Sequence, residues 1–252
     1  MNSGATAGVT CFSVSSSGLE PLGGLRFIPQ TENTDPTPLP PGPRSIAQDI
    51  VFNPSSSALF VTVRSNGGQP GLIYAFPVSN GQVSTKPVVS QFPDLPFAFS
   101  LNFLDGSDEK LFVTNPLLNA PGAAIVSVSY PSLKITTAKT VAIPGQMAVC
   151  WAAPAPRQNE IFVIDAMQAN VNVVDIKSGD FKGQAHYPAP PTTGGIDSVF
   201  AEKWLYTLTA DLKAPKVLVF EVGRGLPTLV QSYDIFSTVG QIPAWLGLAI
   251  WG

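Results

Sequence analysis

The chain has 252 residues, of which only 12% are charged, and its 14 Lys and Arg against 17 Asp and Glu give a formal net charge of −3. Average soluble domains carry about 25% charged residues. Because the basic residues form no cluster that would follow a phosphate backbone, the sequence excludes nucleic acid as a partner. No apolar run approaches the roughly 20 residues of a membrane-spanning helix, so a membrane partner is excluded as well.

Proline and glycine are abundant, with 25 and 22 residues respectively. Proline inside a helix removes a backbone donor and clashes with the preceding turn, which excludes a mainly helical fold. Hydrophobic residues make up 44% of the chain, which is enough for a large core and excludes global disorder. We therefore expect a turn-rich, all-β chain that folds as a single domain over residues 1–252.

The N-terminal segment predicts two strands followed by a loop. Met1 to Thr6 lacks a basic region followed by an apolar core. The sequence as given thus predicts a cytoplasmic location, or an extracellular one if a signal segment lies upstream. Residues 8–14 and 19–28 predict a pair of strands. Pro29 to Arg44 is rich in proline and predicts a polyproline-biased loop, which is also the natural contact for a protein partner.

The rest of the chain repeats a short apolar strand. Four runs share a leucine or isoleucine followed by an aromatic residue, and they are Leu59–Thr62, Leu111–Asn115, Ile161–Asp165 and Leu205–Leu208. Their aromatic residues recur at intervals of 52, 50 and 44 residues. A second set of alternating strands follows the first after a loop, and it covers residues 72–78, 124–130, 170–176 and 216–222. Since two kinds of strand keep the same spacing, the repeat is real.

Each repeat predicts four strands. Inner strands such as 47–53 and 98–104 precede the apolar strand, and outer strands such as 83–91 and 135–143 follow the alternating one. Four-stranded units at this spacing are typical of a β-propeller. Residues 243–251 predict one more inner strand, which together with residues 8–28 would form a composite blade. We expect about five blades, four full and one composite, unless the chain is a piece of a larger propeller cut within a blade.

Several segments resemble a known family. The segments 111–115 and 169–179 resemble the YVTN propeller repeat, and the segments 8–14 and 143–151 are similar to fungal lactonase-type propellers of the 3-carboxymuconate-cyclase-like group. The resemblance covers nearly all of the chain. It implies a propeller fold and a lactonase, cyclase or isomerase activity of the kind used in fungal secondary metabolism.

The residues that commonly carry catalysis are scarce. One histidine, His186, excludes a multi-histidine metal site within the chain. His186 falls on a predicted outer strand and no Gly-x-Ser-x-Gly motif is present, so a Ser-His-Asp hydrolase has no support. Cys11 and Cys150 are interpreted as small buried hydrophobic residues, and a disulfide between them stays open at this stage. No glycine-rich phosphate loop precedes a helix, and no nucleotide cofactor is expected.

Acidic residues offer little for a metal either. Lactonase propellers of the metal-dependent kind hold a divalent cation with carboxylate and amide oxygens. The acids nearest the predicted inner strands are Asp49, Asp165 and Asp197. Asp165 and Asn115 share a repeat position, but Val63 and Thr209 occupy it in the other repeats, so the repeat builds no ring of ligands. We expect these side chains to cap turns, and we expect no metal.

The starts of the inner strands predict the site. Inner strands line the propeller channel, where side chains form an apolar pocket with a few polar groups. We expect Trp151 to stack against an unsaturated ligand and Asp197 to hydrogen-bond or transfer a proton, as the catalytic pair. The expected substrate-binding residues are Gln48, Phe97, Phe99, Gln146, Cys150 and Trp245. Packing between blades is the alternative role for each of these side chains.

The sequence thus favours an enzyme that binds a small-molecule substrate and forms or opens a ring without a metal, because positioning alone lowers the barrier of such reactions. Two alternatives remain at this stage. One is a non-catalytic propeller that binds a protein partner through its loops, and the other is a truncated, secreted, metal-dependent lactonase.

Overall fold

The computed structural model describes residues 1, 7–28, 46–65, 69–209, 211, 213–239 and 248–249. Within this part the chain is all-β, with small antiparallel sheets of the β-propeller class. Four of these sheets have four or five strands each. The chain divides into two compact units, Met1–Val113 with Val126–Ala138 and Thr114–Ile125 with Lys139–Gly252.

The N-terminal residues form a long hairpin in the first unit. The strands are β1 (Gly8–Val9), β2 (Phe12–Ser15), β3 (Gly18–Pro21) and β4 (Arg26–Phe27). β1 pairs with β4, and β2 pairs with β3. The predicted pair of strands over residues 8–28 is confirmed as one hairpin. The loop from Pro29 to Arg44 lies outside the described residues.

The first full blade follows in the same unit. Its strands are β5 (Ile46–Phe52), β6 (Ala58–Arg64), β7 (Gly71–Ser79), β8 (Gln82–Val83) and β9 (Val88–Phe92). The expected single outer strand over 83–91 is wrong, because β8 and β9 pair with β7 as separate pieces. Between them the Ser84 hydroxyl accepts the Lys86 N–H at 3.0 Å and closes a turn, and Pro87 has no N–H to offer the sheet.

The second blade has the order β10 (Leu101–Phe103), β11 (Lys110–Thr114), β12 (Ala123–Ser129) and β13 (Lys134–Val141). Its inner strand is shorter than the predicted 98–104. The reason is a turn directly before it, in which the Ala98 N–H donates to the Leu95 carbonyl at 3.0 Å.

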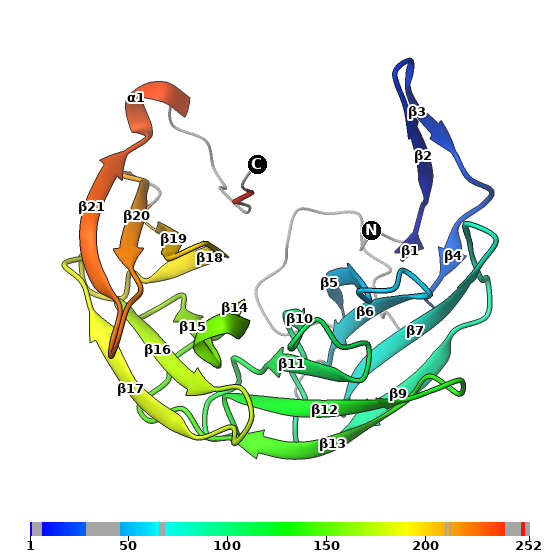
Figure 1. Ribbon diagram of the computed structural model, residues 1–252, viewed down its shortest axis with the longest axis horizontal. Helices are drawn as coiled ribbons and strands as arrows, with labels where there is room; N and C mark the ends of the chain where they lie inside the picture. Colours follow the sequence, from blue (N-terminus) through cyan, green and yellow to red (C-terminus); the bar gives the residue numbers. More distant parts are fainter. Residues whose placement is uncertain are drawn as a thin grey trace. The chain divides into compact units, whose positions relative to one another are not determined.

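The third and fourth blades lie in the second unit and have the predicted strand order. The third has β14 (Val149–Ala155), β15 (Glu160–Asp165), β16 (Asn170–Asp175) and β17 (Phe181–His186), with a short 3₁₀ turn, η1 (Pro156–Gln158), after β14. The fourth has β18 (Gly195–Ala201), β19 (Trp204–Thr209), β20 (Lys216–Glu221) and β21 (Thr228–Asp234), and α1 (Phe236–Val239) follows. Figure 1 shows the strands of each sheet side by side. His186 is exposed at the end of β17, as expected for an outer strand.

Strands in the middle of a blade are apolar because neighbouring blades cover both of their faces. Every residue of β15 is buried, and so is every residue of β6 except the last. In the second unit a single core cluster joins Phe162 and Val173 of the third blade to Leu205 and Phe220 of the fourth. In the first unit another cluster joins Val9 and Ile28 of the hairpin to strands of the first blade.

Near the C-terminus only Leu248 and Ala249 are described, and they form no regular strand. Most of the predicted inner strand over 243–251 therefore lies outside the described residues. The composite blade and the total of about five blades stay predictions. No helix in the described part of the chain has both the length and the apolar character needed to cross a membrane.

Candidate functional site

The two residues expected to carry catalysis occupy one and the same position of the repeat. Trp151 lies on β14 and Asp197 on β18, and Asp49 holds this position on β5. On the second strands Trp151 pairs with Ile164 and Asp197 pairs with Leu208. In the first blade the Asp49 N–H donates to the Thr62 hydroxyl. β14 and β18 contact each other within the second unit. Trp151 and Asp197 thus lie at the same level on neighbouring inner strands, and both are half-buried.

A register irregularity precedes this position in each of the three blades. The shift lies between Ala47 and Ile50 on β5, between Val149 and Trp151 on β14, and just before Asp197 on β18. A bulge turns the following side chains away from the direction that strict alternation would give them. The alternating pattern of the sequence therefore does not predict where these side chains point.

The Asp197 carboxylate links its inner strand to Leu248, near the C-terminus. It accepts the Ser198 N–H at 2.7 Å and the Leu248 N–H at 2.6 Å. In the first unit the Asp49 carboxylate accepts the N–H groups of Ile50 and Leu101, both at 2.7 Å. The two arrangements match bond for bond. As Leu101 begins the inner strand β10, Leu248 takes the equivalent place after the fourth blade.

Burial raises the pKa of the Asp49 carboxyl above its ordinary value. The backbone N–H groups of Leu101 and Ile50 act in the opposite direction, because they stabilise the charged form, but burial dominates. The carboxylate at this position is therefore a structural link held under partial desolvation.

Two further predicted residues take part in a second link between blades, through their backbone carbonyls. The Thr62 hydroxyl donates to the Phe99 carbonyl, and the Thr114 hydroxyl donates to the Cys150 carbonyl at 2.6 Å. These contacts are repeat-equivalent. The Phe99 ring is half-buried and the Cys150 thiol is buried. Cys150 forms no disulfide, and neither does Cys11, which is half-buried.

The remaining predicted binding residues divide between the units. In the first unit Gln48 is half-buried and its amide lies 3.4 Å from the Ile46 carbonyl. Phe97 lies under a cation, since the Arg64 guanidinium is 5.8 Å from the centre of its ring. Gln146 belongs to the second unit and is described next. Trp245 lies outside the described residues.

In the second unit two loops that precede inner strands and two loops that join second and third strands form one connected structure. We call residues 115–122, 142–148, 166–169 and 187–194 the loop platform. At its centre Asp165, the last residue of β15, is fully buried. Its carboxylate accepts three backbone N–H groups, from Met147 at 2.7 Å, Ala148 at 3.0 Å and Met167 at 2.9 Å. Asp165 thus fixes two loops, and within the described residues no group of three His, Cys, Asp or Glu stands ready for a metal.

Side-chain amides tie the other loops together. The Gln146 amide donates to the carbonyls of Leu117 at 3.1 Å and Ala120 at 3.0 Å. The Gln168 amide donates to the Gly145 carbonyl at 2.6 Å. The fourth loop joins through its backbone, where the Gly194 N–H donates to the Ala166 carbonyl at 3.0 Å. All four loops are therefore held before any ligand arrives.

The sequence analysis found Gln146 on this platform but missed Leu118, Met147 and Met167. Their side chains are exposed by 49%, 37% and 42%. They stand on loops rather than on strands, so the strand periodicity gave no sign of them. The signal that would have found them is the absence of charge from all four loops.

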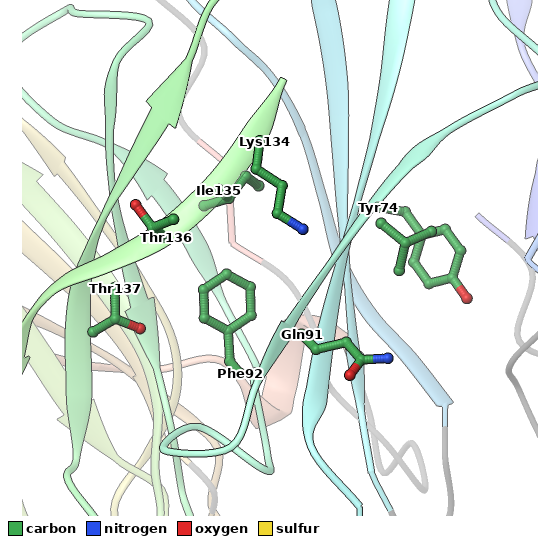
Figure 2. A pocket seen from close by; sticks show the side chains of 8 residues that line it. Tyr74, Gln91, Phe92, Lys134, Ile135, Thr136 and Thr137 are labelled. Atoms are coloured by element: carbon green, nitrogen blue, oxygen red, sulfur yellow. The ribbon is translucent and has the colours of Figure 1, made fainter. Parts of the chain in front are cut away.

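A groove of about 570 Å³ lies elsewhere, on outer strands of the first unit (Figure 2). Its lining residues are Tyr74, Val89, Gln91, Phe92, Lys134, Ile135, Thr136 and Thr137. Figure 2 shows Lys134 extending from β13 toward β9. The Ser90 hydroxyl accepts the Ile135 N–H at 3.0 Å and joins the two walls. No carboxylate, imidazole or thiol lines the groove, and its ionisable side chains are Lys134 and Tyr74.

Comparison with known proteins finds relatives only among solved structures. No family model matches the chain, and no curated protein matches it. A protein from Lactobacillus plantarum superposes with a TM-score of 0.67 at 13% identity, over 91% of this chain and 65% of its own. The periplasmic gluconolactonase of Pseudomonas aeruginosa superposes with a TM-score of 0.60 at 18% identity, over 92% of this chain and 65% of its own.

A functionally unknown protein from Desulfotomaculum acetoxidans gives a TM-score of 0.57 at 13% identity, over 81% of this chain and 61% of its own. The chain therefore spans about two thirds of the length of these structures. At such low identity the likeness is one of fold. The chain has the β-propeller fold that these three proteins share.

Proposed function

We propose that the chain is a small-molecule enzyme of the lactonase type, which opens or forms a ring without a metal. The observation that carries the proposal is the placement of Trp151 and Asp197 at one level of the contacting inner strands β14 and β18. The fold shared with a gluconolactonase supports it. Inner-strand ends are also where a propeller offers a concave surface to a ligand.

Each of the two side chains has a distinct role in the proposal. The half-buried Trp151 offers an aromatic face against which a flat, unsaturated ring stacks. The Asp197 carboxylate accepts one backbone N–H on each oxygen. In the proposal the carboxylate takes a proton from the attacking water in ring opening, or from a hydroxyl of the substrate in ring closure, and the two N–H bonds hold it in place.

The chemistry needs no cofactor. Ring opening adds one water across the ester, so the bond between the acyl carbon and the ring oxygen breaks and a hydroxy acid forms. Ring closure by isomerisation keeps all atoms of the substrate. In both reactions the protein contributes mainly by holding the reacting groups together. This lowers the barrier by several kcal/mol (about 7 or more in favourable cases).

The test uses Trp151→Ala and Asp197→Asn, with turnover of a panel of lactones followed by proton release. We expect each variant to lose roughly 100-fold in kcat/KM. Asp49→Asn is the matched control, because it removes the same kind of link from β5. It should cost similar thermal stability and leave turnover nearly unchanged. Full activity in both Trp151→Ala and Asp197→Asn would overturn the proposed site.

A further inference from the structure

We infer that the substrate of this site is a neutral molecule with a sizeable apolar part, held by the exposed side chains of the loop platform, and not a sugar lactone or a polyanion. The inference rests on the proposed function for the place of the site. It goes further by naming the chemical class of the substrate. Three properties of the loop platform support the inference, namely the absence of charged residues, the exposed apolar side chains and the side-chain amides that already donate hydrogen bonds.

The loop platform carries no charge. Its four loops contain 27 residues, from which Lys, Arg, Asp, Glu and His are all absent. The nearby Asp165 is fully buried and bonded to three N–H groups. A substrate with carboxylates would meet no cation here. Burying its charges without partners would cost far more than the contact returns.

Three large apolar side chains of the loop platform are exposed, namely Leu118, Met147 and Met167. The backbones of Met147 and Met167 lie near each other because their N–H groups bind the same Asp165 carboxylate. Leu118 follows the residue whose carbonyl accepts the Gln146 amide, so it belongs to the same network. Methionine is flexible and polarisable and adapts to apolar ligands of irregular shape. These three side chains present an apolar surface of the kind that a hydrocarbon substituent would cover.

Several polar side chains of the loop platform already donate to loop carbonyls, whereas the buried Tyr187 hydroxyl and the Gln146 Oε1 atom meet no partner among the described residues and Asn119 is exposed. The Asn115 amide donates to the Pro121 carbonyl at 2.7 Å, and the amides of Gln146 and Gln168 donate to loop carbonyls. The Thr192 hydroxyl donates to the Pro191 carbonyl at 2.7 Å. A sugar lactone carries several hydroxyls, each of which loses hydrogen bonds to water on binding. Few side-chain donors of the loop platform are available to the hydroxyls of a sugar lactone. We therefore expect the site to bind an apolar ring more tightly than a sugar ring.

The experiment compares two probes that cannot be opened, with the whole chain, by equilibrium dialysis. One is 2-pentyltetrahydropyran, a neutral ring with an apolar chain, and the other is 1,5-anhydroglucitol, the same ring with hydroxyls. We expect the apolar probe to bind at least about tenfold more tightly. Met147→Lys and Met167→Lys should each weaken its binding roughly tenfold. Leu226→Lys is the control, since Leu226 is 45% exposed in the turn at the other end of its blade.

Turnover of δ-decalactone and glucono-δ-lactone separates this inference from the proposed function. If the apolar probe binds as expected but neither lactone is turned over, the ring-opening function fails and the substrate class stands. If glucono-δ-lactone is opened efficiently and the methionine variants change nothing, the enzyme stands and the inference is overturned. Equal binding of both probes, or no binding of either, also overturns it. Loss of binding in Leu226→Lys would show that the lysine effects are not local, and would overturn it too.

Discussion

At the scale of single residues, buried polar groups near the loop platform differ sharply in how well they are satisfied. Asp165 accepts three N–H groups, whereas the buried hydroxyl of Tyr187 meets no hydrogen-bond partner among the described residues. The Tyr187 ring packs edge-on against Phe220 with centroids 5.7 Å apart. Burial, and to a lesser extent the charge of Asp165, raises the pKa of Tyr187 far above its ordinary value, so the phenol stays neutral.

Replacing Tyr187 by phenylalanine should therefore stabilise the protein. The ring contact remains, and the desolvation cost of an unsatisfied hydroxyl is removed, which we expect to raise the free energy of unfolding by about 1 kcal/mol. Urea denaturation of both proteins measures the difference. Tyr206→Phe is the control, because Tyr206 is half-buried, and it should stay within about 0.5 kcal/mol of the parent. A clear loss of stability in Tyr187→Phe would show that the hydroxyl has a partner that the described residues do not include.

At the scale of elements, loops rather than strands set the precision of the site. Gly194 begins the approach to β18 at a place with no room for a side chain. A Cβ atom there would lie 1.9 Å from the Asp165 carbonyl oxygen and 2.5 Å from that of Gln168. Both are backbone atoms, which cannot move aside as a flexible side chain does. The glycine thus allows two loops of the platform to touch.

Gly194→Ala is expected to destabilise the chain by about 3 kcal/mol, because the overlap forces the loop away from Asp165. Gly223→Ala provides the comparison, since nothing lies within 4 Å of the position of its Cβ. That variant should remain within about 0.5 kcal/mol of the parent. Thermal or urea unfolding measures both. If the two alanine variants were equally stable, the close approach of the loops would be contradicted.

At the scale of the molecule, the blades of the second unit are not independent. One core cluster contains Phe162 of the third blade together with Leu205 and Phe220 of the fourth. Phe162 also contacts Phe200 of β18, with ring centroids 5.8 Å apart. Because each sheet leaves an apolar face to its neighbour, a blade cannot keep its core when the adjoining blade is loosened.

Phe162→Ala should therefore loosen two sheets at once. A cavity of this kind costs about 3–5 kcal/mol. We expect amide hydrogen exchange to accelerate in β18–β21 as well as in β14–β17, as measured by mass spectrometry. Val230→Ala, on the exposed face of β21, is the control and should alter neither sheet. Faster exchange confined to β14–β17 would mean that the blades unfold separately.

The sequence by itself determined the repeat, and with it most of the fold. The spacing of Phe60, Phe112, Phe162 and Tyr206 located the second strand of the four described blades, because β-branched and aromatic residues with a period of two are a local signal. The propeller fold also explains why only 12% of the residues are charged, because both faces of a blade are buried. The break in the outer strand between β8 and β9 was missed, because it depends on one hydroxyl-closed turn.

Only the tertiary structure decided the details of the candidate site. The sequence predicted that Trp151 and Asp197 hold equivalent places of the repeat, but the register shifts just before them are seen only in how the strands pair. The partners of Asp197 and Thr114, at Leu248 and Cys150, lie 51 and 36 residues away along the chain. The Asp165 carboxylate joins two loops that follow different strands. Such contacts depend on how sheets and loops meet in space, and local residue patterns do not encode that.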